Sequence, residues 1–261
     1  MDYKNIIKEV TEKTCLITIN RPKFLNSLNN ETIYELSDCI KSISSDNSIS
    51  SAIITGAENK SFVAGADIKE FKSFNKKQGY DLSKNGHDNL FDLIESSNKP
   101  FIAAINGFAL GGGLELAMAC HIRLASENAK LGLPEVTLGV IPGYGGTQRL
   151  PQLVGKGIAM EMILSGKMIS ADKALKYGLI NYVCGQEDLI HQCEKIANSI
   201  NKNSSSAISN AIKAVNAGYK AGTNGLNSEI ELFASCFETD DFVEGTNAFL
   251  EKRKPNFKKF R

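Results

Sequence analysis

The sequence has almost no net charge, which limits the kinds of partner it can have. Its 261 residues include 30 Lys and Arg against 29 Asp and Glu, a formal net charge of +1 at pH 7. Proteins that bind nucleic acid or acidic membrane surfaces usually carry a clear excess of basic residues. The composition therefore predicts neither a nucleic-acid partner nor a membrane partner. It is typical of a soluble globular protein with a substantial core.

Closely spaced cysteines are also missing. The chain has six cysteines, but no two of them form a Cys-x-x-Cys motif. Such motifs are typical of zinc sites, and dense cysteine frameworks are typical of small secreted domains. Cys120-His121 has no other clustered ligand beside it. We therefore expect no metal site and no disulfide framework, and a reduced, cytoplasmic setting.

Targeting and membrane-spanning segments are not evident. The first residues lack the apolar core and cleavage site of a signal peptide. Residues 101–120 carry a single charge over a length that could span a membrane. Asn106, four glycines and the central Glu115 nevertheless favour a buried core segment over a transmembrane helix.

Two glycine-rich nucleotide motifs are incomplete. Gly155-Lys156 has no glycine five residues before the glycine, so the stretch does not satisfy a phosphate loop. Gly143-x-Gly145 continues to Gln148 where a dinucleotide fingerprint needs glycine. The sequence thus predicts neither type of nucleotide site.

Strands and helices alternate along most of the chain, and helices alone follow from about residue 188. Alternating or short apolar runs predict strands, and helical spacing with Asn29 or Asn30 as cap predicts the first helix. This pattern by itself predicts a doubly wound parallel sheet, then a helical subdomain from near 195. Helical spacing of Leu82, Leu90, Leu93 and Ile94 predicts a long helix over roughly 79–97, although the Lys- and Asn-rich segment 71–86, which overlaps it, is expected to be an exposed, mobile loop. The expected strands are 14–20, 52–56, 101–105, 122–125 and 179–183, and the expected late helices are 188–201, 204–220, 226–238 and 241–251.

The most informative stretch runs from Asn106 to Gly146. Gly111-Gly112-Gly113 lies where the apolar strand 101–105 gives way to a run of helix formers beginning at Leu114. Backbone N–H groups at a helix start have no intrahelical partner and carry the positive end of the helix dipole. Glycines allow another group to approach those donors closely. The stretch is suited to binding an anion, or an oxygen that becomes anionic during a reaction.

Glu115 follows these glycines within an otherwise apolar run, where an unpaired carboxylate is costly to bury. Two interpretations fit the residue equally well. It can complement the helix dipole, which is common. It can also be a carboxyl group tuned for proton transfer beside an oxyanion site.

Several motifs in a fixed order resemble the enoyl-CoA hydratase/isomerase (crotonase) family over nearly the whole chain. Any one of them is weak evidence, whereas their common order is specific. The motifs are Asn20-Arg21-Pro22-Lys23, Ala64-Gly65-Ala66-Asp67-Ile68-Lys69, Asn106-Gly107 through Glu115-Leu116-Ala117, Pro134-Glu135 with Leu138-Gly139, Ile141-Pro142-Gly143 through Gly146-Thr147-Gln148-Arg149-Leu150, and Phe249-Leu250-Glu251-Lys252-Arg253.

The resemblance implies an α/β fold of a different kind from the doubly wound sheet. It implies a crotonase (ClpP-like) spiral of ββα units over residues 1–195. A C-terminal all-helical subdomain over residues 196–261 would serve oligomerisation and cover the active site. Family members usually form homotrimers or dimers of trimers (homohexamers).

The resemblance also implies a site for an acyl-CoA thioester. The backbone N–H groups of Ala66 and Gly112 would form the oxyanion hole, and Glu115 and Glu135 would be catalytic. No metal is implied, and no separate cofactor, since coenzyme A is part of the substrate. Softer assignments, for contacts to coenzyme A or near the catalytic water, are Ala64, Asp67, Ile68, Lys69, Gly143 and Lys252; for Lys23 and Lys252 a solvated surface role is at least as plausible.

The glutamate pair favours one reaction within the family, the reversible hydration of short-chain trans-2-enoyl-CoA to 3-hydroxyacyl-CoA. Relatives that only isomerise a double bond usually lack one of the two glutamates. The near-zero charge disfavours an RNA-binding relative, and the intact glutamate pair disfavours a noncatalytic scaffold. His121 departs from the aspartate of many relatives, and Leu114 and Tyr144 are variable positions, so acyl-chain preference stays open.

Overall fold

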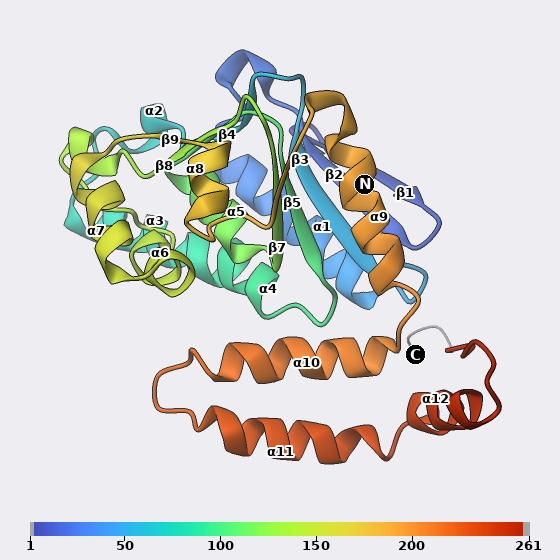
Figure 1. The fold of residues 1–261 in the computed structure, drawn as a ribbon. Coiled ribbons are helices and arrows are strands. Elements are labelled where there is room, and N and C mark those ends of the chain that lie inside the picture. Colours follow the sequence, from blue (N-terminus) through green and yellow to red (C-terminus); the bar gives the residue numbers. More distant parts are fainter. Residues whose placement is uncertain (1–2, 258–261) are drawn as a thin grey trace.

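Two β-sheets form the core of the protein (Figure 1). The structure is a computed structural model and describes residues 3–257. The larger sheet has the strand order β1-β2-β3-β5-β7-β10, and the smaller has the order β4-β6-β8-β9. Their strands are β1 (Ile6–Thr11), β2 (Thr14–Ile19), β3 (Ser51–Gly56), β4 (Ser61–Ala64), β5 (Phe101–Ile105), β6 (Phe108–Leu110), β7 (Ile122–Ser126), β8 (Lys130–Gly132), β9 (Ile169–Ser170) and β10 (Tyr182–Cys184).

Three consecutive strand pairs repeat one pattern. The first strands, β3, β5 and β7, pair in parallel in the larger sheet, and the second strands, β4, β6 and β8, pair in parallel in the smaller sheet. Helices follow each pair, and the predicted spiral of ββα units is thereby confirmed. The doubly wound sheet is wrong because each second strand is only three or four residues long and lies within glycine-rich sequence. The helices that follow the pairs are α2 (Ile68–Phe71) and α3 (Lys76–Gly86), then α5 (Gly112–Ala119), then α6 (Gly146–Val154).

Helices cover both faces of the larger sheet. On one face α1 (Asn30–Ser45) buries the four residues predicted from helical spacing, Ile33, Leu36, Ile40 and Ile43, and Asn29 caps it by accepting from the Thr32 N–H. On the other face α9 (Leu189–Ile200) packs against alternate strand residues through Leu189, Cys193 and Ala197. Residue 195 lies inside this core helix. We therefore propose that the helical subdomain begins after Ile200.

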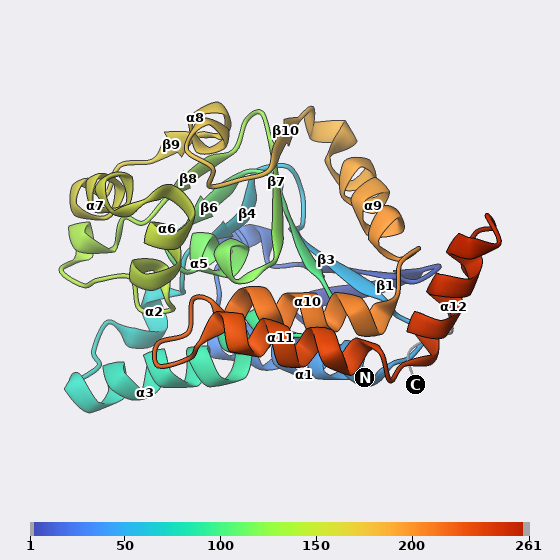
Figure 2. The same cartoon turned by 60° about the horizontal axis from the view of Figure 1, so that its bottom comes forward.

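Three helices then leave the core and form a separate layer beside it, as Figures 1 and 2 show. They are α10 (Ser205–Ala217), α11 (Gly225–Cys236) and α12 (Asp240–Leu250), close to the predicted ranges. The side chains of Ser204, Asn224 and Thr239 accept hydrogen bonds from the first-turn N–H groups of these helices. Such caps fix where a helix begins, although the helical pattern alone predicted these ranges.

The expected loop over 71–86 is wrong from residue 76 onward, whereas the helical pattern predicted over roughly 79–97 is present, in a helical stretch that begins at Lys76 and ends at Glu95. Asn75 and Gln78 form a reciprocal capping box that starts α3, and a π-helical turn (His87–Phe91) and α4 (Asp92–Glu95) continue it. Most of α3 is exposed, as a polar composition predicts, but an exposed segment with a good cap can still be helical. The two remaining α-helices are α7 (Lys156–Ser165) and α8 (Ala171–Lys176). In the described range, no helix has both the length and the apolar character needed to cross a membrane.

Asn106 ties the second ββ unit to the first. Its side-chain amide donates to the carbonyls of Gly56 and Glu58, and its side-chain oxygen accepts from the Gly56 N–H. Gly56 ends β3, and Asn106 lies in the turn between β5 and β6. These buried bonds hold the turn that leads to β6 against the end of the neighbouring strand.

Replacing Asn106 by alanine should lower the free energy of unfolding by about 2–4 kcal/mol, because two buried backbone groups of Gly56 lose their partner. Urea denaturation at fixed protein concentration measures the change. Asn128→Ala is the matched control, since Asn128 is exposed and makes one long bond to Asn59, and it should shift stability by less than about 0.5 kcal/mol. Equal effects of the two substitutions would contradict this role for Asn106.

Candidate active site

Two backbone amides meet where the first and second ββ units turn into their helices. The bridge between Leu28 and this segment uses the Gly65 carbonyl and the Asp67 N–H, which leaves the Ala66 N–H outside the ladder. Gly112 is the first residue of α5, so its N–H has no carbonyl one turn earlier in that helix. A β-carbon built on Gly112 would lie 3.7 Å from the Ala66 nitrogen, so the two residues are direct neighbours.

Glycines make this approach possible. Gly111 has a φ of +52° and turns the chain from β6 into α5. A β-carbon on Gly113 would lie 2.0 Å from the Val63 carbonyl oxygen, so only glycine lets the start of α5 pack directly on β4. The close contact between α5 and β4 is what places the two amides side by side.

Glu115 lies one helical turn into α5 and is only 1% exposed. Its Oε1 atom accepts hydrogen bonds from the Tyr144 N–H (2.8 Å) and the Gly146 N–H (2.7 Å). Burial raises the pKa of this carboxyl to about 7, because the loss of hydration outweighs the two N–H donors. The nearby Glu135 charge raises the pKa further. Glu115 is thus poised to change protonation near neutral pH.

Glu135 comes from the third ββ unit, at the start of a 3-10 turn (Glu135–Leu138) after β8. A β-carbon on Gly111 would lie 2.8 Å from its Oε1 atom, so its carboxyl group adjoins the Gly111-Gly112 turn. Its Oε2 atom is buried and has no hydrogen-bond partner in the part of the chain that the structure describes. Burial raises its pKa above the usual range of glutamate. The structure therefore brings together the four residues Ala66, Gly112, Glu115 and Glu135.

Arg149 holds the turn that binds Glu115, a role that the sequence did not reveal. From α6, its Nη1 donates to the Tyr144 carbonyl (2.9 Å) and its Nε and Nη2 pair with Glu95 (3.1 and 2.7 Å). The Glu95 backbone carbonyl in turn accepts from the Asn216 side chain of α10 (2.7 Å). A chain of bonds thus links the C-terminal helices to the turn around Glu115. The only signal in the sequence was that Arg149 belongs to one of the family motifs.

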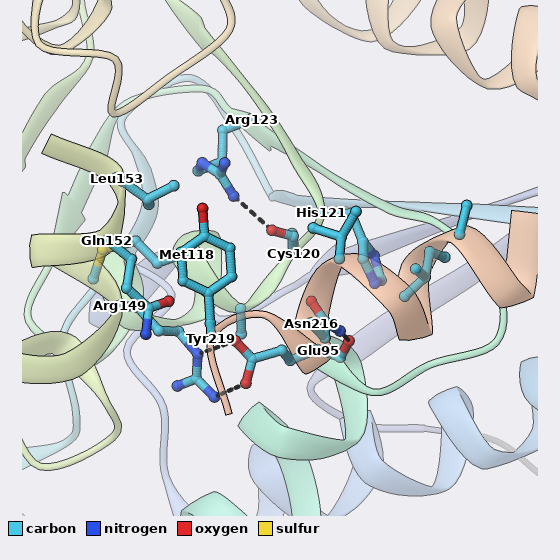
Figure 3. A pocket seen from close by; sticks show the side chains of 14 residues that line it. Glu95, Met118, Cys120, His121, Arg123, Arg149, Gln152, Leu153, Asn216 and Tyr219 are labelled. Carbon is cyan, nitrogen blue, oxygen red and sulfur yellow. Dashed lines mark hydrogen bonds and ion pairs between the residues drawn. The ribbon is translucent and has the colours of Figure 1, made fainter. Parts of the chain in front are cut away.

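A pocket of about 410 Å³ lies between α5, α6 and α10, and Figure 3 shows its lining, including the Glu95–Arg149 pair. Its lining includes none of the four residues brought together above. His121 is one of its walls: the Nδ1 atom accepts from the Phe101 N–H (2.9 Å), and burial lowers the pKa of the ring to about 4. His121 is therefore a neutral hydrogen-bond acceptor that anchors the start of β5. The pocket is separate from the site formed by Glu115 and Glu135, since neither of these residues lines it.

The residues predicted to contact coenzyme A fall into two groups. Ala64, Asp67, Ile68 and Lys69 lie at the turn from β4 to α2, beside Ala66. Ile68 and Lys69 are exposed there, whereas the Asp67 carboxylate caps α2 through the Lys69 N–H and pairs with Arg21 (3.3 Å). This carboxylate therefore holds the turn in place.

The second group lies around the Glu115 turn and at the chain end. The Gly143 carbonyl accepts from the Ser83 hydroxyl (2.6 Å), next to the Tyr144 N–H that binds Glu115. Lys252 lies just beyond α12, which is at the opposite end of the molecule from α2 in both Figures 1 and 2. The structure does not bring Lys252 to the other predicted residues of the same chain. Lys23 is exposed in a 3-10 turn (Pro22–Phe24).

The raised pKa of Glu115 means that ionising this carboxyl group above pH 7 destabilises the folded protein, and a neutral side chain of the same shape should remove that cost. Between the unfolded value near 4.5 and the folded value of about 7, the folded protein binds more protons, so its stability falls as pH rises. Glu115→Gln should therefore be more stable than wild type at pH 8, by about 3 kcal/mol, and the difference should shrink to below about 1 kcal/mol at pH 5. Urea denaturation at the two pH values measures it. Glu127 is exposed, so Glu127→Gln is the control and should show no such pH dependence. A wild type as stable as Glu115→Gln at pH 8 would refute the raised pKa of Glu115.

Comparisons with known proteins identify the family of the chain. The family described as Enoyl-CoA hydratase/isomerase matches residues 9–260. The chain is 45% identical over 258 residues to the crotonyl-CoA hydratase of Syntrophomonas wolfei, covering 98% of this chain and 99% of that protein. It is 46% identical over 255 residues to the short-chain-enoyl-CoA hydratase of Clostridium acetobutylicum, covering 97% of each. The crystal structure of an enoyl-CoA hydratase from Bacillus anthracis superposes with a TM-score of 0.91 at 39% identity, covering 98% of this chain and 99% of that one. The protein thus belongs to the enoyl-CoA hydratase/isomerase family and has the crotonase fold.

Proposed function

We propose that the protein is a hydro-lyase that reversibly hydrates short-chain trans-2-enoyl-CoA, with crotonyl-CoA and 3-hydroxybutyryl-CoA as the substrate pair. The observation that carries this proposal is a pair of carboxyl groups with raised pKa values, the buried Glu115 and the half-buried Glu135, beside two neighbouring backbone amides. The similarity to two short-chain hydratases over nearly the full length supports it. An isomerase needs no second carboxyl group to activate water, so the pair favours hydration.

The thioester carbonyl oxygen accepts hydrogen bonds from the N–H groups of Ala66 and Gly112. When water adds to the β-carbon, electron density moves through the α-carbon onto this oxygen and creates an enolate. Two fixed donors stabilise that charge without reorganisation, and one such donor contributes roughly 3–4 kcal/mol in comparable sites. The positive end of α5 points to the same place because Gly112 is its first residue.

Glu115 takes the proton of the attacking water. Its Oε1 already accepts two backbone N–H bonds, which favour the charged form and fix the carboxylate in place. A pKa of about 7 is close to the optimum for a general base at neutral pH. The water oxygen bonds to the β-carbon as its proton passes to this carboxylate.

Glu135 supplies the proton that the α-carbon gains. Its Oε2 atom is buried and has no hydrogen-bond partner among the described residues, and burial raises the pKa of the carboxyl group, which makes its protonated form more accessible as a proton donor. The enolate returns to the carbonyl as this proton bonds to the α-carbon, so one water is consumed and one 3-hydroxyacyl thioester is formed. The proton now on Glu115 passes back to Glu135 before the next cycle. Environments that keep one carboxyl charged and the other neutral are the general solution for paired acid and base roles.

Turnover of crotonyl-CoA, followed by loss of the conjugated thioester absorbance, tests this assignment. Glu115→Gln and Glu135→Gln should each lower kcat by about 10²–10⁴-fold, since each removes a proton-transfer group. Glu127→Gln, a surface change of the same kind, should leave kcat unaltered. Full turnover in either active-site variant would show that glutamate to be wrongly assigned. An inert wild type that still binds acyl-CoA would point to a sister reaction on the same scaffold.

We also propose that the protein assembles as a homotrimer or a dimer of trimers. Helix α11 has no buried residue, and three of its apolar side chains, together with that of the residue at its C-cap, form an exposed stripe at helical spacing. Each is more than half exposed, and soluble monomers rarely leave so continuous a patch open to water. A second copy would cover this stripe, and the exposed Lys252, which lies away from the other predicted residues of its own chain, would then face the coenzyme of a neighbouring copy. The stripe consists of Leu226, Ile230, Phe233 and Phe237.

Placing a charge in the stripe should disrupt this assembly. Ile230→Glu is expected to lower the molar mass in light scattering from a multiple of the 28.4 kDa protomer towards the protomer itself, because a buried unpaired charge is costly at an apolar interface. Asn227→Glu adds the same charge on an exposed polar position of the same helix and should leave the mass unchanged. A wild type that is monomeric at micromolar concentration would rule the assembly out.

A further inference from the structure

Tyr144 fills space directly beside the oxyanion amides. Its backbone N–H binds Glu115, and its side chain is only 5% exposed. A β-carbon on Gly112 would lie 3.4 and 3.6 Å from the Cδ2 and Cε2 atoms of the ring, which is van der Waals contact. The ring therefore lies against the same glycine whose N–H would hold the thioester oxygen.

The ring is also fixed from its other sides. Phe91 stacks on it with ring centroids 4.7 Å apart and planes 13° apart. On the opposite edge, a β-carbon on Gly86 would come within 2.3 Å of Cε1, so the ring packs against the bare backbone of α3. An aromatic ring held by a stacked partner and two backbones cannot move aside without displacing α3 or the π-helical turn that carries Phe91.

This position is where the end of an acyl chain must lie. With the carbonyl oxygen on Ala66 and Gly112, the α- and β-carbons face Glu135 and Glu115, and the γ-carbon follows next. The Tyr144 N–H donates to Glu115 and the Tyr144 ring contacts Gly112, so in this binding mode the carbons beyond the β-carbon lie against the ring. A longer chain would need the volume that the ring occupies.

We infer that the Tyr144 ring, backed by Phe91 and Gly86, closes the acyl pocket and restricts the site to chains of about four carbons. This inference rests on the proposed function, whose substrate class it narrows. Closed apolar pockets discriminate by about 10–200-fold for one methylene group. The phenol hydroxyl is not needed for this effect, since the ring alone occupies the space.

Chain-length profiles of wild type and Tyr144→Ala test the inference. In wild type, kcat/KM for trans-2-octenoyl-CoA should be at least tenfold below that for crotonyl-CoA. Tyr144→Ala should raise the octenoyl-to-crotonyl ratio by tenfold or more. Tyr144→Phe, which keeps the ring, should retain the wild-type ratio. Tyr144→Leu, which keeps an apolar side chain of smaller size, should give an intermediate ratio and covers the case that the alanine variant does not fold.

Binding of the unreactive butyryl-CoA and octanoyl-CoA, measured by calorimetry, separates this inference from the proposed function. One outcome is that wild type hydrates no enoyl-CoA while Tyr144→Ala or Tyr144→Leu shifts the binding ratio towards octanoyl-CoA. In that case Tyr144 does close the acyl pocket, and the proposed hydratase reaction is wrong. If wild type hydrates octenoyl-CoA as well as crotonyl-CoA, the inference is overturned while the hydratase stands. An unchanged ratio in both smaller variants would likewise overturn it.

Discussion

The arrangement of the site depends on one interaction, the buried carboxyl group of Glu115 held by the backbone N–H groups of Tyr144 and Gly146. A carboxylate in an apolar helix would be strongly destabilising without such partners. The two donors come from the turn before α6, so α5 and that turn must be in register for either to be stable. The stability of this part of the core and the geometry of the site therefore have the same cause.

The spiral of ββα units explains how distant parts of the chain meet there. The first unit contributes the Ala66 amide, the second contributes Gly112 and Glu115, and the third contributes Glu135. Equivalent strands pair in parallel, so equivalent turns stack at one edge of the smaller sheet. Repeats of one structural unit thus supply backbone amides and two carboxyl groups to the same site. Gly113 allows the close packing of α5 on β4 that brings the first two units together.

The network behind the site extends to the C-terminal helices. Arg149 connects the Tyr144 carbonyl with the Glu95 side chain, and the Glu95 carbonyl accepts from Asn216 of α10. The charge of Arg149 also lowers the pKa of Glu115, in opposition to burial. The packing of α10 on the core and the electrostatics of the candidate base are therefore coupled through a short chain of hydrogen bonds.

The sequence by itself determined the features that depend on neighbouring residues. A cap and hydrophobic spacing predicted α1, and the helical pattern predicted the helices from 204 to 251. The resemblance carried by the order of the motifs implied the spiral and the roles expected of Ala66, Gly112, Glu115 and Glu135. The short second strands, the capping box that starts α3 at Lys76, the role of Arg149 and the placement of the Tyr144 ring emerged only from the tertiary structure. Parallel pairing joins segments about 20–50 residues apart, and a pKa shift depends on whatever surrounds the group in space. No local pattern contains that information, which is why the sequence indicated which groups the site uses and the fold decided how they act on one another.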